Sequence, residues 1–83
     1  MNITVKLGGA LVKYAPPDTK GSSHELSLPE DANVQHVLDR FQVPADQPLM
    51  IILNDAMVAR PNYTTTNLND GDSLALMPPI TAG

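Results

Sequence analysis

The stretch NVQHVLDRF, residues 33–41, decides how the rest of the chain can pack. Its apolar residues recur at i, i+3, i+4 and i+7, which is the spacing of one face of a helix. These residues are Val34, Val37, Leu38 and Phe41. Asn33 is a favourable N-cap, and Pro44 cannot continue a helix. Because one helix covers only one face of a sheet, the flanking strands are expected to form a single mixed sheet with the helix packed across one face.

Strand patterns occur on both sides of this helix. Runs rich in alternating or continuous apolar residues predict strands at residues 2–7, 24–28, 47–53, 56–58 and 73–77. The first two strands flank a turn-rich loop, residues 15–23, and are expected to form a hairpin. Residues 59–70 are expected to be a polar loop anchored by Leu68. The sequence therefore predicts an α+β fold, a mixed sheet of about five strands with one main helix on one face.

The chain is expected to end in an extended tail. Pro78 and Pro79 cannot continue a central strand, and they hold the backbone extended. We therefore divide the chain into a globular domain, residues 1–78, and a tail, residues 79–83. Five residues beyond Pro78 reach roughly 16 Å when extended, which is enough to insert a terminal carboxylate into a pocket of a partner. An ordinary frayed terminus is the alternative interpretation of the same residues.

Composition limits the possible functions. Nine acidic residues face five basic ones, for a net charge of −4, so we expect a partner with a basic surface and no nucleic acid. The absence of cysteine excludes a disulfide framework, a thiolate metal site and a thiol nucleophile. No apolar run approaches the length of a membrane span, and the first residues contain no hydrophobic signal core. We therefore expect a cytoplasmic protein that binds no membrane.

No group of side chains has the spacing of a catalytic or metal site. Neither His24 nor His36 has a carboxylate or a second histidine at the sequence spacing that is typical of metal ligands. Both are therefore predicted to be solvated surface histidines, and no metal is expected. Gly8-Gly9 follows a strand, but no phosphate-loop pattern follows it, and we interpret the pair as relief for the backbone. A chain of 83 residues is also too small to enclose a deep cleft.

Two methionines are candidates for a docking surface. By alternation, Met77 points to the opposite side of its strand from Leu74 and Leu76, and Met57 lies on the short return strand. Exposed, flexible apolar side chains suit a surface that binds more than one partner. Packing in the core is the alternative role for both residues.

Several stretches resemble one family. NDGDSLALMPPITAG, residues 69–83, resembles the C-terminal signature of the molybdopterin synthase small subunit, in the MoaD/ThiS family of ubiquitin-like β-grasp sulfur carriers. ITVKLGGALVKYAP, residues 3–16, resembles the opening strand of that family. LPEDANVQHVLDRF, residues 28–41, resembles its passage from strand to helix, and LMIILND, residues 49–55, its strand ending in asparagine. The order and spacing of these motifs make the resemblance specific.

The resemblance implies a route for sulfur. An E1-like adenylating enzyme would use ATP to activate the C-terminal carboxylate of Gly83, and a sulfur donor protein would convert it to a thiocarboxylate. The tail residues Pro79, Ile80, Thr81 and Ala82 would then enter the large subunit of molybdopterin synthase, where the sulfur is delivered for the dithiolene of molybdopterin. The protein would be a non-catalytic small subunit with no tightly bound cofactor, since ATP is used by the activating partner. Met57 and Met77 would face the partners.

Alternatives remain within and outside this family. The thiamine branch of the family delivers sulfur to a thiazole ring, whereas Pro78-Pro79-Ile80 and the long loop at residues 15–23 favour the molybdopterin branch. Delivery of sulfur to another thiolated metabolite is a further alternative, and a ubiquitin-like interaction module without chemistry is the third. Ala82 stands where the family pattern has glycine, and the added methyl group is expected to slow activation of Gly83 without abolishing it.

Overall fold

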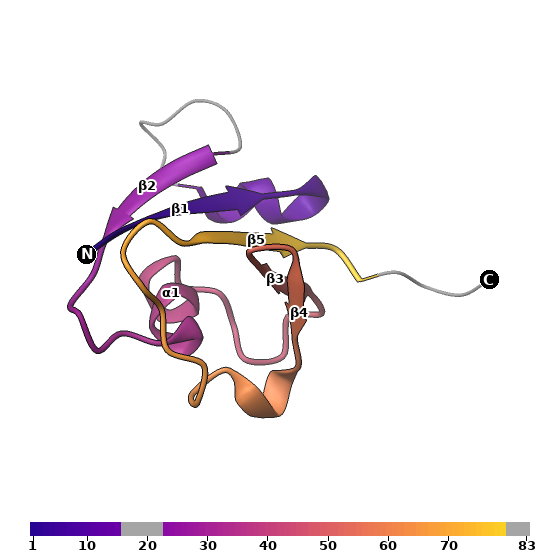
Figure 1. The fold of residues 1–83 in the computed structure, drawn as a ribbon. Coiled ribbons are helices and arrows are strands. Elements are labelled where there is room, and N and C mark those ends of the chain that lie inside the picture. The colour runs from indigo at the N-terminus through magenta and orange to yellow at the C-terminus, as the bar shows by residue number, and fades with distance from the viewer. Residues whose placement is uncertain (16–22, 80–83) are drawn as a thin grey trace.

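The computed structural model describes residues 1–15 and 23–79 (Figure 1). Its elements, in chain order, are β1 (Asn2–Leu7), the 3-10 helix η1 (Gly9–Tyr14), β2 (Ser23–Ser27), α1 (Val34–Arg40), β3 (Met50–Leu53), β4 (Ala56–Val58), the 3-10 helix η2 (Arg60–Asn62) and β5 (Ser73–Met77). The predicted strand at residues 47–53 begins only at Met50, because Pro48 has no N–H to donate to a ladder.

The described strands form one mixed sheet in the order β2-β1-β5-β3-β4. The two central strands, β1 and β5, run parallel, and every other pairing is antiparallel, including the predicted hairpin of β1 and β2. Helix α1 lies beneath one face of this sheet (Figure 1). The expected α+β architecture, with a five-stranded mixed sheet and one α-helix on one face, is therefore confirmed for the described residues.

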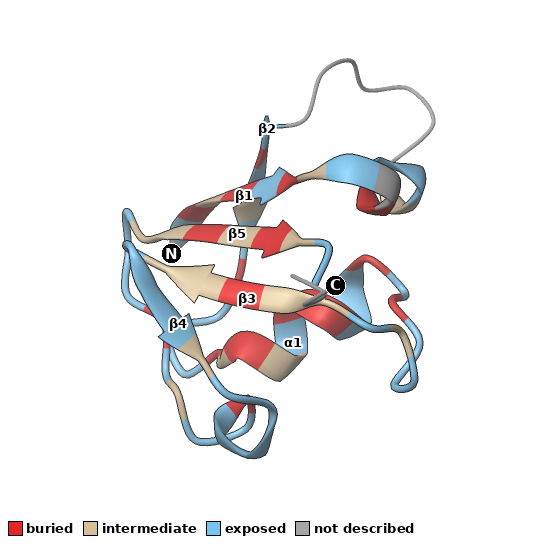
Figure 2. Ribbon diagram, turned by 90° about the vertical axis from the view of Figure 1, so that its right-hand side faces the viewer, coloured by how far each residue is buried: buried red, intermediate tan, exposed pale blue. Residues whose placement is uncertain are grey.

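The core lies between α1 and the sheet. Alternate residues of the central strands are buried there, and they meet the apolar stripe of the helix (Figure 2). The buried residues include Ile3, Val5, Leu7, Ile51, Leu74 and Leu76 from the strands, Val34, Val37 and Leu38 from α1, and Leu11 from η1. The residues of opposite parity in β1 and β5 remain on the open face of the sheet.

The helix begins with a reciprocal pair of hydrogen bonds. The backbone N–H of His36 donates to Oδ1 of Asn33 over 3.1 Å, and the backbone N–H of Asn33 donates to Nδ1 of His36 over 2.9 Å. A histidine thus takes the place that glutamate or glutamine usually has in a capping box. The predicted N-cap is correct, and His36 is exposed as expected.

His24 is not a surface residue, and its predicted solvation is wrong. It is directly opposite the buried Val5 in the β1–β2 ladder, so its side chain is directed to the core side of the sheet. Only 7% of the residue is exposed, and its ring centroid lies 6.2 Å from that of Phe41. Its Nε2 is buried without a hydrogen-bond partner in residues 1–15 and 23–79.

We expect His24→Leu to stabilise the fold. A buried polar atom without a partner costs about 1–3 kcal/mol, so an apolar side chain should raise the free energy of unfolding by about 1 kcal/mol. Urea unfolding measures this change. His36→Leu is the matched control, because it removes a capping contact and should lower stability by about 0.5–1 kcal/mol. A loss of stability in His24→Leu would show that the imidazole makes a favourable interaction.

The segment between β4 and β5 has an anchor that the sequence did not reveal. Leu68 is buried as predicted, but Tyr63 is buried as well. The guanidinium of Arg60, at the start of η2, donates to the carbonyl oxygens of Ala45 over 2.9 Å and Gln47 over 3.2 Å. These contacts hold the chain that precedes β3 against η2.

Tyr63 gives the fold a dependence on alkaline pH. Burial raises the pKa of Tyr63 above its ordinary value of 10.0, and the neighbouring Arg60 partly opposes this effect. The unfolded chain therefore loses this proton first, so the free energy of unfolding should fall as the pH rises above about 10, with no contribution below that value. Tyr63→Phe should remove this part of the loss in urea unfolding at alkaline pH. If the free energy of unfolding fell equally steeply with pH in the wild-type protein and in Tyr63→Phe, Tyr63 would not be the group responsible.

Candidate functional site

The open face of the sheet carries an apolar patch at the end where β5 leads into the tail. Leu74 and Leu76 of β5 are buried toward α1, so Ala75 and Met77 point to the opposite face. In the ladders, Met77 is opposite Met50, Ala75 is opposite Ile52, and Ile52 is opposite Met57. We call the five residues Met50, Ile52, Met57, Ala75 and Met77 the open-face patch.

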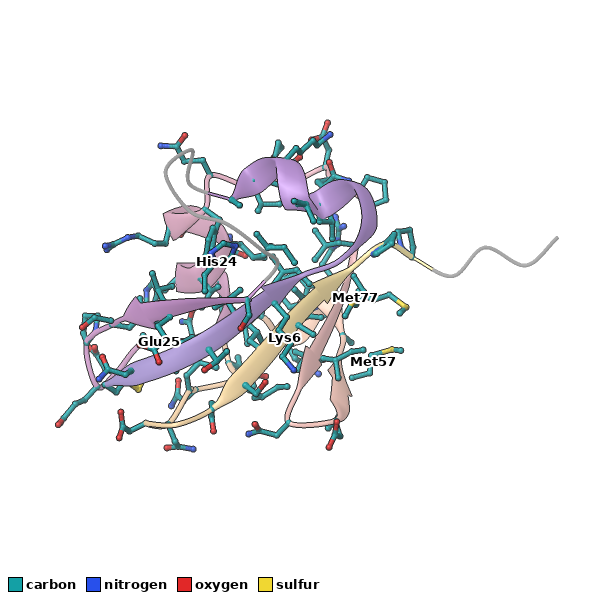
Figure 3. The ribbon with its side chains drawn as sticks, turned by 90° about the horizontal axis from the view of Figure 1, so that it is seen from above. Lys6, His24, Glu25, Met57 and Met77 are labelled. Carbon is teal, nitrogen blue, oxygen red and sulfur yellow. The ribbon has the colours of Figure 1, made fainter. Side chains whose placement is uncertain are left out.

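Met57 and Met77, the two methionines predicted to form a docking surface, both lie in this patch. Met57 is 68% exposed on the edge strand β4, whereas Met77 is half-buried. Figure 3, which looks onto the open face, shows the two side chains on the same side of the molecule, next to the point where the chain leaves β5. Packing in the core is thus not the role of Met57, and its contact with a partner stays a prediction.

The other half of the open face is polar and charged. Lys6 of β1 lies opposite Ala75, and Glu25 of β2 lies opposite Thr4 (Figure 3). Both charged side chains are exposed. Neither residue was predicted as a site residue, although the alternation of residues 2–7 already places Lys6 on the face away from the core. The face therefore changes from charged at β2 and β1 to apolar at β3 and β4.

A turn and a side-chain network hold the apolar half in place. Asn54 and Asp55, between β3 and β4, both have positive φ, at 48° and 72°, as a two-residue hairpin turn requires. The Asn54 amide donates to the Asp72 carboxylate over 2.9 Å, and its oxygen accepts from the backbone N–H of Ser73 over 2.9 Å. The start of β5 is thereby fixed to the β3–β4 hairpin.

The tail begins at the end of β5. Pro78 and Pro79 follow Met77 and are exposed. Of the predicted tail residues, Ile80, Thr81, Ala82 and Gly83 lie outside the described part of the chain. Residues 1–15 and 23–79 contain no group of three histidine or acidic side chains that could hold a metal ion. None of the helices in this part of the chain is long and apolar enough to cross a membrane.

A mixed sheet in this order with one helix across it defines the ubiquitin-like β-grasp class. The model of the ThiS family matches residues 14–83, which is most of the chain. This protein belongs to the ThiS family and is a sulfur carrier of the ThiS/MoaD type. No protein of curated function is detectably similar in sequence.

Solved structures support the fold. A thiamine biosynthesis protein (ThiS) from Geobacter metallireducens is 22% identical over all of both chains, with a TM-score of 0.67. SAMP1 from Haloferax volcanii is also 22% identical over all of both chains, with a TM-score of 0.74. A chain from the complex of subunits 1 and 2 of the molybdopterin-converting factor of Helicobacter pylori is 20% identical over all of both chains, with a TM-score of 0.59. These relatives include proteins named for thiamine and for molybdopterin synthesis.

Proposed function

We propose that Gly83 carries sulfur as a C-terminal thiocarboxylate and that this protein is the small subunit of a molybdopterin synthase. The family match carries the proposal, because it extends through Gly83 in a chain that contains no cysteine. The sulfur of methionine is a thioether and cannot be transferred in this way. The terminal carboxylate is then the group that remains to accept sulfur.

The chemistry requires an activating partner. A carboxylate is a poor electrophile until one of its oxygens becomes part of a leaving group. An E1-like adenylating enzyme would join the Gly83 carboxylate to the α-phosphate of ATP and release pyrophosphate. Sulfur at the oxidation level of sulfide would then attack the acyl carbon, so that a C–S bond forms and AMP leaves. If the donor protein carries a persulfide, a thiol would also be needed to reduce the resulting acyl disulfide to the thiocarboxylate. Both steps need a narrow tail, and the exposed Pro78 and Pro79 at the end of β5 support a tail that begins at residue 79.

The open-face patch supports docking beside the tail. A partner that covers Met57 and Met77 also lies next to the point where the tail leaves the domain (Figure 3). Burial of such apolar side chains contributes to affinity, and Lys6 and Glu25 at the charged end of the face would orient the partner. The acidic body of the protein, with a net charge of −4, suits a basic partner groove.

Two observations favour different destinations for the sulfur. The Pro78-Pro79-Ile80 sequence and the long loop at residues 15–23 favour molybdopterin. The name of the matched family and the ThiS structure from Geobacter metallireducens favour thiamine as the second candidate. Co-purification separates them. A stable complex with a molybdopterin synthase large subunit, and sulfur transfer from the loaded protein to its pterin precursor, supports the first. Transfer only to a thiazole-forming enzyme supports the second.

We expect Ala82→Gly to speed the activation step several-fold. Glycine removes a methyl group from a tail that must pass through a narrow channel, and it widens the accessible backbone conformations. The initial rate of pyrophosphate release by the E1-like enzyme measures the effect. The unfolding midpoint should not change, which serves as the control. A slower rate in Ala82→Gly would mean that the activating partner has a pocket for the Ala82 methyl group.

A further inference from the structure

Two glycines lie against the start of the tail, although they are almost 70 positions away in the sequence. Gly8 and Gly9, the glycine pair, follow the last residue of β1. The backbone N–H of Gly8 donates to the carbonyl oxygen of Leu76 over 2.8 Å and so extends the contact between β1 and β5 by one residue. Met77 and Pro78, which we call the tail root, come directly after this hydrogen bond.

The tail root occupies the space that side chains of the glycine pair would need. A Cβ atom on Gly8 would overlap Sδ of Met77 and lie 3.5 Å from its Cε. A Cβ atom on Gly9 would lie 2.8 Å from Cγ and 3.3 Å from Cδ of Pro78. Met77 can respond to such a clash by rotating its side chain. The Pro78 ring has no such freedom, so the backbone of the tail root would have to move.

Gly9 is also in a conformation that favours glycine. Its φ is +54°, in the left-handed region. Gly71 provides a comparison, since its φ is +87° but a Cβ atom there would meet nothing within 4 Å. The two positions therefore share the backbone requirement and differ in the contact with the tail root. Gly71 lies before the start of β5, at the opposite end of that strand from Met77.

We propose that the glycine pair consists of positioning residues for sulfur loading. Gly8 leaves room for Met77 to lie on the docking face, and Gly9 leaves room for Pro78 and so sets the direction in which the tail starts. The inference rests on the proposed function and assigns part of it to residues outside the tail. Five residues would reach roughly 16 Å beyond Pro78 if they were fully extended, so a small rotation at the tail root would become a large displacement of the terminal carboxylate.

The first test compares Gly9→Ala with Gly71→Ala. Both variants place a side chain at positive φ and should lose stability in urea unfolding. Gly9→Ala should lose more than Gly71→Ala, because its Cβ atom also meets the Pro78 ring. In sulfur loading by the E1-like enzyme, Gly9→Ala should lower kcat by about tenfold or more, because misplaced reacting groups cost that much, while KM changes little. Gly71→Ala should retain both constants. Equal kinetics in the two variants would overturn the role of Gly9.

The second test is a double-mutant cycle between Gly8 and Met77. Gly8→Ala should raise KM, because Met77 is displaced from the docking face, and kcat should change less. In a Met77→Ala background the same Gly8→Ala change should have almost no further effect, because the overlapping sulfur is gone. Additive effects of the two substitutions would overturn the role of Gly8.

The wild-type protein separates this inference from the proposed function. A wild-type protein that gains no sulfur with its E1-like enzyme, ATP and a sulfur donor would refute the proposed function, and the positioning role with it. A wild-type protein that is loaded, together with a Gly9→Ala variant that is loaded equally fast, would refute the positioning role alone.

Discussion

We expect one extra alanine appended after Gly83 to suppress sulfur loading. The carboxylate that must react would become an amide carbonyl, which neither carries the negative charge nor attacks ATP. The new terminal carboxylate would lie about 3.5 Å further along the tail, beyond the position where the activating enzyme holds its nucleotide. A displacement of that size should lower the rate by at least about 100-fold. Intact-mass measurement during incubation with the E1-like enzyme, ATP and a sulfur donor gives this rate.

The appended variant has its own control in binding and stability. The addition lies outside the globular domain, residues 1–78, so the unfolding midpoint should equal that of the wild-type protein. The affinity for the E1-like enzyme should change little, because the proposed docking surface is the open-face patch and not the tail. If the appended variant gained sulfur at the wild-type rate, the carrier group would not be the carboxylate of Gly83. If it lost affinity in proportion to its activity, the tail would act in binding alone.

Met57→Asp should weaken the binding of both protein partners by about 10- to 100-fold. Met57 is 68% exposed in the free protein, so an aspartate there remains hydrated and the fold should keep its stability. In a complex that covers the open-face patch, the same carboxylate would be buried among apolar side chains without a partner. Titration calorimetry with the E1-like enzyme, and separately with the large synthase subunit, measures the loss.

Val12→Asp is the matched control for this substitution. Val12 is the other large apolar residue that is well exposed in the described part of the chain, at 43%, and it lies on η1 outside the open-face patch. The control should bind both partners with wild-type affinity. A loss of binding in Val12→Asp with no loss in Met57→Asp would move the docking surface from the open face to η1.

The elements of the fold follow from local patterns. Asn33 and the apolar stripe after it define α1, and the alternation of residues 2–7 defines β1 together with its buried and open sides. The pairing of β1 with β5 cannot be predicted from local patterns, because most of the chain separates these two strands in the sequence. The position of β5 in the sheet could therefore be expected only from the resemblance to the β-grasp family.

His24 was predicted to be solvated because histidine is polar, whereas the alternation of residues along its strand indicates a buried position. Its polar ring suggested a solvated position. However, it has the same parity as Leu26 and Leu28, and this alternation placed it on the inner face of β2. Tyr63 had no such signal, since it lies in an irregular segment where its burial depends on tertiary contacts alone.

The candidate site was predictable only in part, because some of its contacts join residues that are far apart in the sequence. The orientation of Met77, opposite to that of Leu76, follows from strand alternation. The exposure of Met57 depends instead on its place in the edge strand β4, whose burial pattern does not alternate. Gly8 and Gly9 were recognised as a break after β1, but the residues that need the free space are at the other end of the sequence. Contacts of this kind depend on the strand order, which no local window contains.

The position of the transferred sulfur is the most direct test of the proposed function. The protein is incubated with its E1-like enzyme, ATP and a sulfur donor, and the C-terminal peptide is then fragmented in a mass spectrometer. We predict that one sulfur replaces one oxygen on the terminal carboxyl group of Gly83 and that every other residue keeps its mass. An unchanged peptide after the enzyme has turned over ATP, or sulfur at any residue other than Gly83, would contradict this prediction.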